Sequence, residues 1–155
     1  MGKEYTKEQI IQETWEHILD VMCATVKVKD ALTIRAVDHD RDKLIPENTQ
    51  ILADALNSGK WEEWNKIHME KQRHHIEWMF NNLNQSGCNL FDLIESVIDG
   101  VTANYRRNGG NATYESQFAF YKRKGFDDTL ATILANTFME IHEMFVESFK
   151  ESETL

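Results

Sequence analysis

The stretch TKEQIIQETWEHILDVMCATVKV, residues 6–28, carries the periodicity that decides the fold class. Its large apolar side chains recur three or four residues apart, which is the spacing of one face of an α-helix. Thr6 stands before this run and can cap the first turn. The stretch therefore predicts a helix with a broad apolar face. That face consists of Ile10, Trp15, Ile18, Leu19, Met22 and Val26.

The same spacing continues along the rest of the chain and predicts further helices. Only one proline and seven glycines interrupt the sequence, and a strand-rich domain needs more turn residues than this. We therefore predict an all-α protein, a compact bundle of six or seven helices forming a single domain over residues 1–155, with a frayed tail at 150–155. The further helices are predicted at residues 30–38, 47–57, 60–84, 89–106, 114–123 and from about 128 to 149.

Length and charge exclude several classes of protein. A chain of 155 residues is long enough for one hydrophobic core. Its net charge of −9 argues against broad nucleic-acid binding, which requires clustered Lys and Arg. A few basic residues could still hold one small phosphate ligand. There is no apolar run of membrane-spanning length and no apolar segment of a signal peptide near the start. We therefore expect a cytoplasmic protein that does not bind membranes.

Residues that can bind metals recur in order along four consecutive helical pieces. Imidazole nitrogen and carboxylate oxygen suit divalent ions such as Zn²⁺, Mn²⁺ and Fe²⁺, and such ions can activate a bound water molecule. A single histidine on a helix is more often structural, and DHDRD at 38–42 could be a solvated acidic turn. The ordered set favours a metal site over these readings. It consists of His17, His39, Asp40, His68, His74, His75 and Asp99.

The predicted helix at 60–84 sets an expectation for three of these histidines. In a regular helix, His68 and His75 would lie on nearly the same face but about 10 Å apart along the axis. One ion could then hardly bind both, whereas two neighbouring ions could. His74 would point about 100° away from His75 and would reach the same site only if the helix were distorted.

The order of these residues resembles the signature of the HD-domain superfamily of metal-dependent phosphohydrolases. That signature is a His, then an adjacent His-Asp pair, then a later Asp, which correspond here to His17, HD at 39–40 and Asp99. HDRDK at 39–43 is similar to the HDxxK form of the motif, in which the lysine faces substrate phosphate. Lys43 occupies that position.

A second stretch strengthens the resemblance. HHIEW at 74–78 is similar to a stretch found in a small family of phage and bacterial HD-like proteins, which also has a His six residues earlier, as His68 is here. The resemblance covers roughly residues 10–106. This sequence departs from the family's pattern at Asp42, because the related family usually has Ser or Gly just before the lysine.

The resemblance implies a helical HD-like bundle that binds one or two divalent ions, with Mn, Fe, Zn, Mg and Co as candidates. One ion would be held by His17, His39, Asp40 and Asp99, and a second by Asp40 with His68 and either His74 or His75. Lys43 would contact the phosphate, and Glu77 or Glu13 would orient a histidine or complete the ligand shell. The implied substrate is a nucleotide or another small phosphate ester or diester. A base could stack on Trp64, Trp78 or Tyr105, although aromatic residues at helical spacing are more often part of a core.

Two other functions stay open at this point. The chain could be a non-catalytic HD-like binding or inhibitor protein, for instance a phage factor acting in the host cytoplasm, and it could form a homo-oligomer. It could also be a helical pyrophosphohydrolase that binds Mg²⁺ through ExxE and ExxD pairs. ETWE at 13–16 supplies one such pair, but Glu95 and Asp99 are four residues apart and the chain is rich in histidine, which argues against this class.

Overall fold

The computed structural model describes residues 5–82 and 87–152, and no strand occurs among them. The all-α prediction is confirmed, with seven α-helices in the described residues. Contacts divide the chain into two units, Met1–His39 and Asp40–Leu155. Within the described residues, no helix is both long and apolar enough to cross a bilayer. Of the tail predicted to fray, 150–152 continue the last helix and 153–155 lie outside the described residues.

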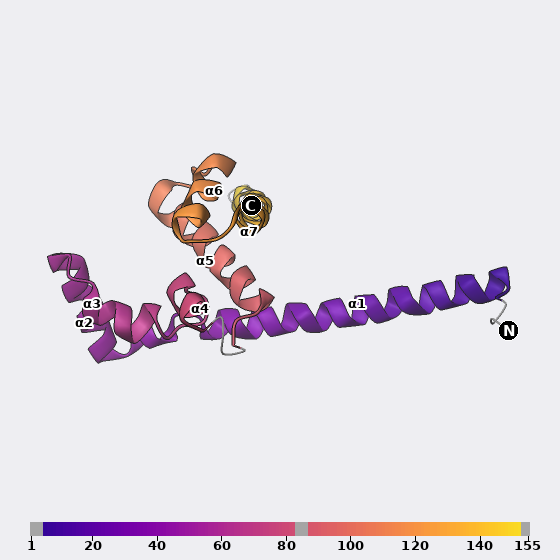
Figure 1. Ribbon diagram of the computed structural model, residues 1–155, viewed down its shortest axis with the longest axis horizontal. Coiled ribbons are helices and arrows are strands. Elements are labelled where there is room, and N and C mark those ends of the chain that lie inside the picture. The colour runs from indigo at the N-terminus through magenta and orange to yellow at the C-terminus, as the bar shows by residue number, and fades with distance from the viewer. Residues whose placement is uncertain (1–4, 83–86, 153–155) are drawn as a thin grey trace. The chain divides into compact units, whose positions relative to one another are not determined.

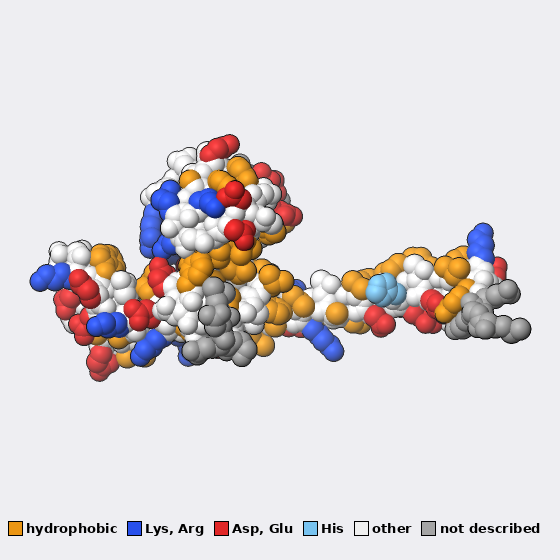
Figure 2. All heavy atoms as spheres, in the orientation of Figure 1, with side chains coloured by type: hydrophobic (Ala, Val, Ile, Leu, Met, Phe, Trp, Pro, Cys, Tyr) orange, Lys and Arg blue, Asp and Glu red, His pale blue; other side chains and the backbone are white. Residues whose placement is uncertain are grey.

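The first unit is a single helix, α1 (Lys7–Asp38), which Figure 1 shows in indigo to purple. Thr6 caps it as predicted, accepting a hydrogen bond from the Gln9 backbone, while the Gln9 side chain bonds back to the Thr6 backbone. The predicted break near residue 29 is absent, because neither Gly nor Pro interrupts the helical hydrogen bonds there. None of its residues is buried, and hydrophobic side chains lie open along it in Figure 2.

The second unit begins with η1, a 3₁₀ turn (Arg41–Leu44), followed by α2 (Pro46–Ser58). Pro46 occupies the first helical position, where its missing N–H has no consequence. α2 ends at Gly59, whose φ of 72° lies in the left-handed region that glycine adopts most easily.

The predicted helix at 60–84 is wrong, because the chain turns in its middle. The structure has α3 (Glu62–Trp64), a short π-helix η2 (Asn65–Met69), a turn, and α4 (Ile76–Asn82). Arg73 in the turn makes two hydrogen bonds to Asp92, through Nε at 3.0 Å and Nη2 at 2.8 Å. Asp92 is fully buried and lies in the helix that begins at Leu90. This bidentate ion pair therefore holds the turn against that helix, and it outweighs the tendency of residues 60–84 to form one continuous helix.

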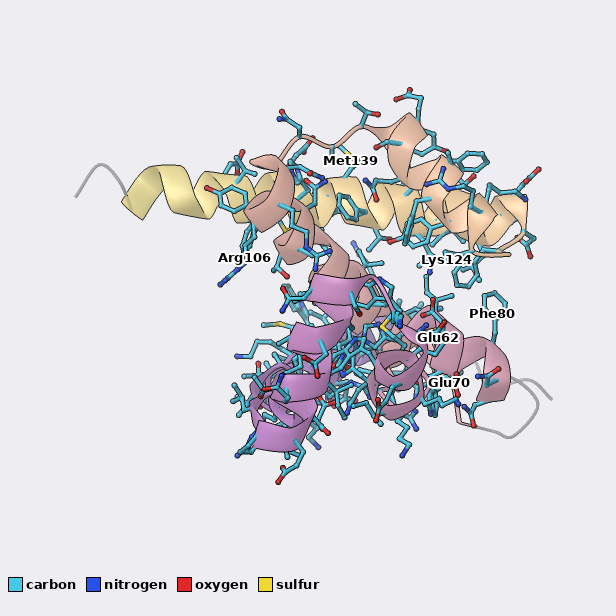
Figure 3. All side chains as sticks on the ribbon, turned by 90° about the vertical axis from the view of Figure 1, so that its left-hand side faces the viewer. Glu62, Glu70, Phe80, Arg106, Lys124 and Met139 are labelled. Carbon is cyan, nitrogen blue, oxygen red and sulfur yellow. The ribbon has the colours of Figure 1, made fainter. Side chains whose placement is uncertain are left out.

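The remaining helices, α5 (Leu90–Asn108), α6 (Tyr114–Arg123) and α7 (Asp128–Ser152), form most of the core. α7 packs against both α5 and α6, and Figure 3 shows α6 alongside it. Gly100 lies against the Phe138 ring, where a Cβ would make a contact of 3.4 Å. The buried core residues are Ile76, Val97, Val101, Tyr121, Ala131, Leu134, Ala135 and Phe138.

Candidate metal centre

Four potential metal ligands gather within the second unit: Asp40, His68, His74 and His75. Each offers one ligand atom, and these atoms lie within 4.8 Å of one another. The Asp40 Oδ1 atom lies 3.3 Å from His68 Nε2 and 3.5 Å from His74 Nε2. His68 and His74 are only 1% and 3% exposed. A compact, largely buried set of three imidazoles and one carboxylate could hold a divalent metal ion.

The broken helix is what brings the histidines together. The Nε2 atoms of His68 and His75 lie 2.8 Å apart, whereas a regular helix would separate the two residues by about 10 Å along its axis. The separation of about 10 Å, on which the expectation that one ion could hardly bind both residues depended, is therefore wrong for this structure. The turn fixed by Arg73 replaces the helical geometry on which that expectation depended.

The 3₁₀ turn η1 positions the carboxylates of the cluster. Asp40 adopts a left-handed conformation with φ 59° and accepts a hydrogen bond from the Lys43 backbone N–H at 2.9 Å. The first turn of α2 holds this segment from the other side. Asn48 donates to the Asp42 carbonyl at 3.0 Å, and Thr49 donates to the Lys43 carbonyl at 2.5 Å.

Two further carboxylates lie on the outer nitrogens of the buried imidazoles. Asp42 Oδ2 is 2.7 Å from His68 Nδ1, a hydrogen bond, and Glu95 Oε1 is 3.4 Å from His74 Nδ1. Sequence reasoning missed both roles. Asp42 was visible only as a departure from a motif, and Glu95 only through its spacing to Asp99.

The charges in the cluster shift two pKa values strongly. Burial by itself raises the pKa of the Asp40 carboxyl. Hydrogen-bonding interactions with His68, His74 and Lys43 oppose burial and hold that pKa well below its usual range. Burial, with the nearby charges of His74 and His68, lowers the pKa of His75 to about 3. At neutral pH the site therefore contains an ionised carboxylate and a neutral His75 imidazole, which are the protonation states that a metal ion requires.

The two predicted catalytic side chains beside the cluster are both in ion pairs. Lys43 Nζ lies 2.6 Å from Asp40 Oδ2. Glu77 was expected to orient a histidine or complete the ligand shell; its carboxylate accepts a hydrogen bond from Lys124 at 2.7 Å, and the expected role stays a prediction. Burial raises the pKa of Glu77, but the hydrogen bond and charge of Lys124, a backbone hydrogen bond and the charge of His75 together lower the pKa overall.

The remaining predicted ligands are His17, His39 and Asp99. His17 lies exposed in α1, and His39 caps the end of that helix. They are 22 residues apart in the sequence, which corresponds to about 33 Å along a straight helix. The structure thus does not bring His17 and His39 together, and a ligand role for His17 stays a prediction. Asp99 lies in α5 and lines the same cavity as His68 and His75.

This cavity has a volume of about 840 Å³ and extends from the histidines along one face of α5. Its basic lining residues are Lys43, Arg107 and Lys124, and Trp61 adds an indole that is 40% exposed. Sequence reasoning did not identify Trp61.

The three aromatic residues expected to stack on a base have other contacts. Trp64 is nearly buried and stacks on His68 with ring centroids 4.5 Å apart. The Arg73 guanidinium covers the ring of Trp78 at 4.7 Å from its centroid. Tyr105 packs edge-on against Phe145. Trp61 is therefore the more open aromatic surface for a ligand in this cavity.

Comparison with known proteins gives one family. Neither the curated proteins nor the solved structures contain a match to this chain. A family model with the description "Family of unknown function (DUF5662)" matches residues 6–140. That range includes α1, the candidate metal centre and most of α7. The chain therefore belongs to the family described as a family of unknown function, DUF5662.

Proposed function

We propose that this protein is a metal-dependent phosphohydrolase of the HD-domain type that acts on a nucleotide or another small phosphate ester. The observation that carries the proposal is the convergence of Asp40, His68, His74 and His75. A buried ionised carboxylate needs a charged or hydrogen-bonding partner. A cluster of such groups is often a functional site, and a bound metal ion is one partner that fits three imidazoles and a carboxylate. A metal bound there would supply Lewis acidity and lower the pKa of a bound water.

The cavity beside the cluster supports an anionic substrate. The cavity lining includes the cations Lys43, Arg107 and Lys124 together with the carboxylates Glu77 and Asp99. Lys43 and Lys124 are paired with carboxylates in this structure, so the cavity would bind an anion most strongly once a metal ion engages Asp40. The volume of about 840 Å³ lies within the range of small-molecule sites.

Lys43 has a specific part in the proposed reaction. In the described structure its ammonium group pairs with the Asp40 carboxylate at 2.6 Å. A cation bound by Asp40 would compete for that carboxylate and release the Lys43 ammonium to bind a phosphate oxygen. Metal and substrate binding would thus be coupled through one side chain. Trp61 would cover the apolar part of the substrate.

Elemental analysis and an activity screen test the proposal. Protein purified without chelator should retain a transition metal, or should bind Mn²⁺, Co²⁺ or Zn²⁺ after treatment with EDTA. The reloaded protein should release phosphate or a nucleoside from a panel of nucleotides, and chelation should abolish this activity.

The His74→Ala variant, which removes one buried imidazole of the cluster, tests the site directly. It should lose both metal and activity while keeping its helical circular dichroism spectrum. Wild-type protein that binds less than about a tenth of an equivalent of every metal tested would contradict the metal site. Protein that binds metal but cleaves no phosphate ester would contradict hydrolysis alone, and would favour the non-catalytic alternative.

A further inference from the structure

Asp42 contacts His68 on the side of the ring that faces away from the cluster. Asp42 Oδ2 lies 2.7 Å from His68 Nδ1, and its side chain is 15% exposed. The other ring nitrogen, His68 Nε2, faces Asp40 Oδ1 at 3.3 Å and His75 Nε2 at 2.8 Å. The imidazole is therefore held between an outer carboxylate and the centre of the cluster.

This contact places a hydrogen on the Nδ1 atom of His68. An ionised carboxylate only accepts hydrogen bonds, so the Nδ1 atom facing Asp42 must be the donor. When a metal ion replaces the hydrogen on the Nε2 atom that faces Asp40, the ring keeps its hydrogen on Nδ1 and offers the Nε2 lone pair to the ion. Trp64 stacks on the ring with an interplanar angle of 26° and restricts its plane.

We propose that Asp42 is a positioning residue of the metal centre, which holds His68 as an Nε2 ligand and makes that nitrogen a stronger donor to a metal. The inference rests on the metal site of the proposed function. A carboxylate on the far nitrogen of a metal-binding histidine fixes its tautomer and raises its basicity. The second carboxylate oxygen, Asp42 Oδ1, is buried and accepts no hydrogen bond within the described residues. The charge of Asp42 is therefore directed mainly at the imidazole.

The backbone of the turn does not depend on the Asp42 side chain. Its carbonyl accepts hydrogen bonds from the Asn48 side chain at 3.0 Å and from the Ile45 N–H at 3.2 Å. Substitution of the side chain should therefore leave η1 in position. Glu95 lies at 3.4 Å from His74 Nδ1, beyond a strong hydrogen bond, and should matter less.

Titration with Co²⁺ alone tests the inference, because its visible absorption reports coordination. Metal-free Asp42→Ala should bind Co²⁺ about 10- to 100-fold more weakly than wild type, the range found when such outer partners are removed. Asp42→Asn keeps an acceptor but removes the charge, so its affinity should lie between the two. Asp54→Asn, an exposed site on α2, is the matched control and should match wild type.

Long-range ¹H–¹⁵N NMR of the histidine rings supplies a readout that a purely structural role would not change. In metal-free wild type, His68 should be protonated on Nδ1. Asp42→Asn should keep this tautomer, and Asp42→Ala should lose it at least in part. If Asp42→Ala does not fold, as judged by circular dichroism, Asp42→Asn still tests the effect of charge on Co²⁺ affinity.

The outcomes separate this inference from the proposed function. Tight Co²⁺ binding by wild type with a large loss in Asp42→Ala supports the inference even if no phosphate ester is cleaved. Equal Co²⁺ affinity of Asp42→Ala and wild type overturns it and leaves hydrolysis untouched. A wild-type His68 that carries a hydrogen on Nε2 and none on Nδ1 in the metal-free protein also overturns it.

Discussion

At the scale of single residues, the carboxylate of Asp40 contacts one ammonium group and two imidazoles, and a metal ion would compete with them. Its Oδ2 atom binds the Lys43 ammonium, while Oδ1 faces the Nε2 atoms of His68 and His74. A half-buried carboxylate with this many partners stays ionised. Each partner that leaves Asp40 makes it more available to a metal ion.

The Lys43→Met variant should therefore separate metal binding from phosphate binding. Removing the ammonium removes a competitor for Asp40, so the affinity for Mn²⁺ should stay the same or rise. Phosphate binding to the Mn²⁺-loaded protein should weaken about 10-fold or more, since a charge-assisted hydrogen bond is lost. Isothermal titration calorimetry measures both constants, and Lys60→Met in the exposed turn after α2 is the control. A large loss of Mn²⁺ affinity would be the contrary result.

His75 should make the metal-free protein sensitive to mild acid. Its pKa is about 3 in the fold against an ordinary value of 6.5. Between these values the unfolded chain binds the extra proton, so stability falls as the pH drops from 6.5 towards 3. The slope from this group is at most about 1.4 kcal/mol per pH unit.

Urea unfolding in EDTA at pH 6.5 and pH 4.5 checks this expectation. Wild type should lose more free energy of unfolding between the two values than His75→Gln does, because glutamine does not titrate. This window lies above 3.8, the ordinary pKa of an Asp carboxyl, so Asp40 contributes little to the loss and contributes equally in both proteins. Parallel losses in the two proteins would show that His75 is not the group responsible.

At the scale of elements, the turn η1 depends on α2. The Thr49 hydroxyl donates to the Lys43 carbonyl at 2.5 Å and also lies 3.0 Å from the Ile45 carbonyl. Thr49→Val keeps the shape of the side chain and removes these bonds, so the free energy of unfolding should fall by about 1 kcal/mol. Thr137→Val is the control, because its hydroxyl bonds only within α7, to the Ile133 carbonyl at 2.8 Å. Urea denaturation should show the larger loss for Thr49→Val.

Sequence patterns correctly predicted the helices whose ends are fixed by residues close to them in the sequence. The helix predicted at 114–123 coincides with α6, and Thr113 caps it. α2 begins at Pro46, one residue before the predicted start at 47. These boundaries depend on caps and helix-initiating residues that lie within a few positions of each helix end.

The histidine cluster could be predicted in composition but not in geometry. The sequence identified Asp40, His68, His74 and His75 as ligand candidates, and the structure gathers them. Their arrangement depends on the pairing of Arg73 with Asp92, two residues far apart in the sequence. No periodic pattern reveals such a contact, so the sequence predicts one continuous helix over residues 60–84. The same limitation hid the roles of Asp42 and Glu95.

At the scale of the second unit, charge is distributed unevenly around the cavity. α5 places Asp99 near the histidines and Arg107 two turns later, on the same cavity wall. These positions are about 12 Å apart along the helix axis. Arg107 could simply complement the helix dipole at the end of α5, as Arg106 also would. The two arginines differ in that Arg107 lines the cavity, whereas Arg106 points outward from α5 in Figure 3.

Comparison of these two arginines tests whether the cavity binds substrate along its length. A nucleoside 5′-phosphonate, which resembles a nucleotide but is not cleaved, serves as the probe in calorimetry with Mn²⁺-loaded protein. Arg107→Gln should weaken binding about 3- to 10-fold, a partly exposed charged contact being worth less than a buried one. Arg106→Gln should change affinity less than about twofold and should match Arg107→Gln in thermal stability, because both remove the same interaction with the helix dipole.

The loss of affinity in Arg107→Gln should shrink as salt is raised, since exposed charges are screened. Equal effects of both substitutions would mean that Arg107 acts on the helix end, and that the ligand occupies only the part of the cavity beside the histidines.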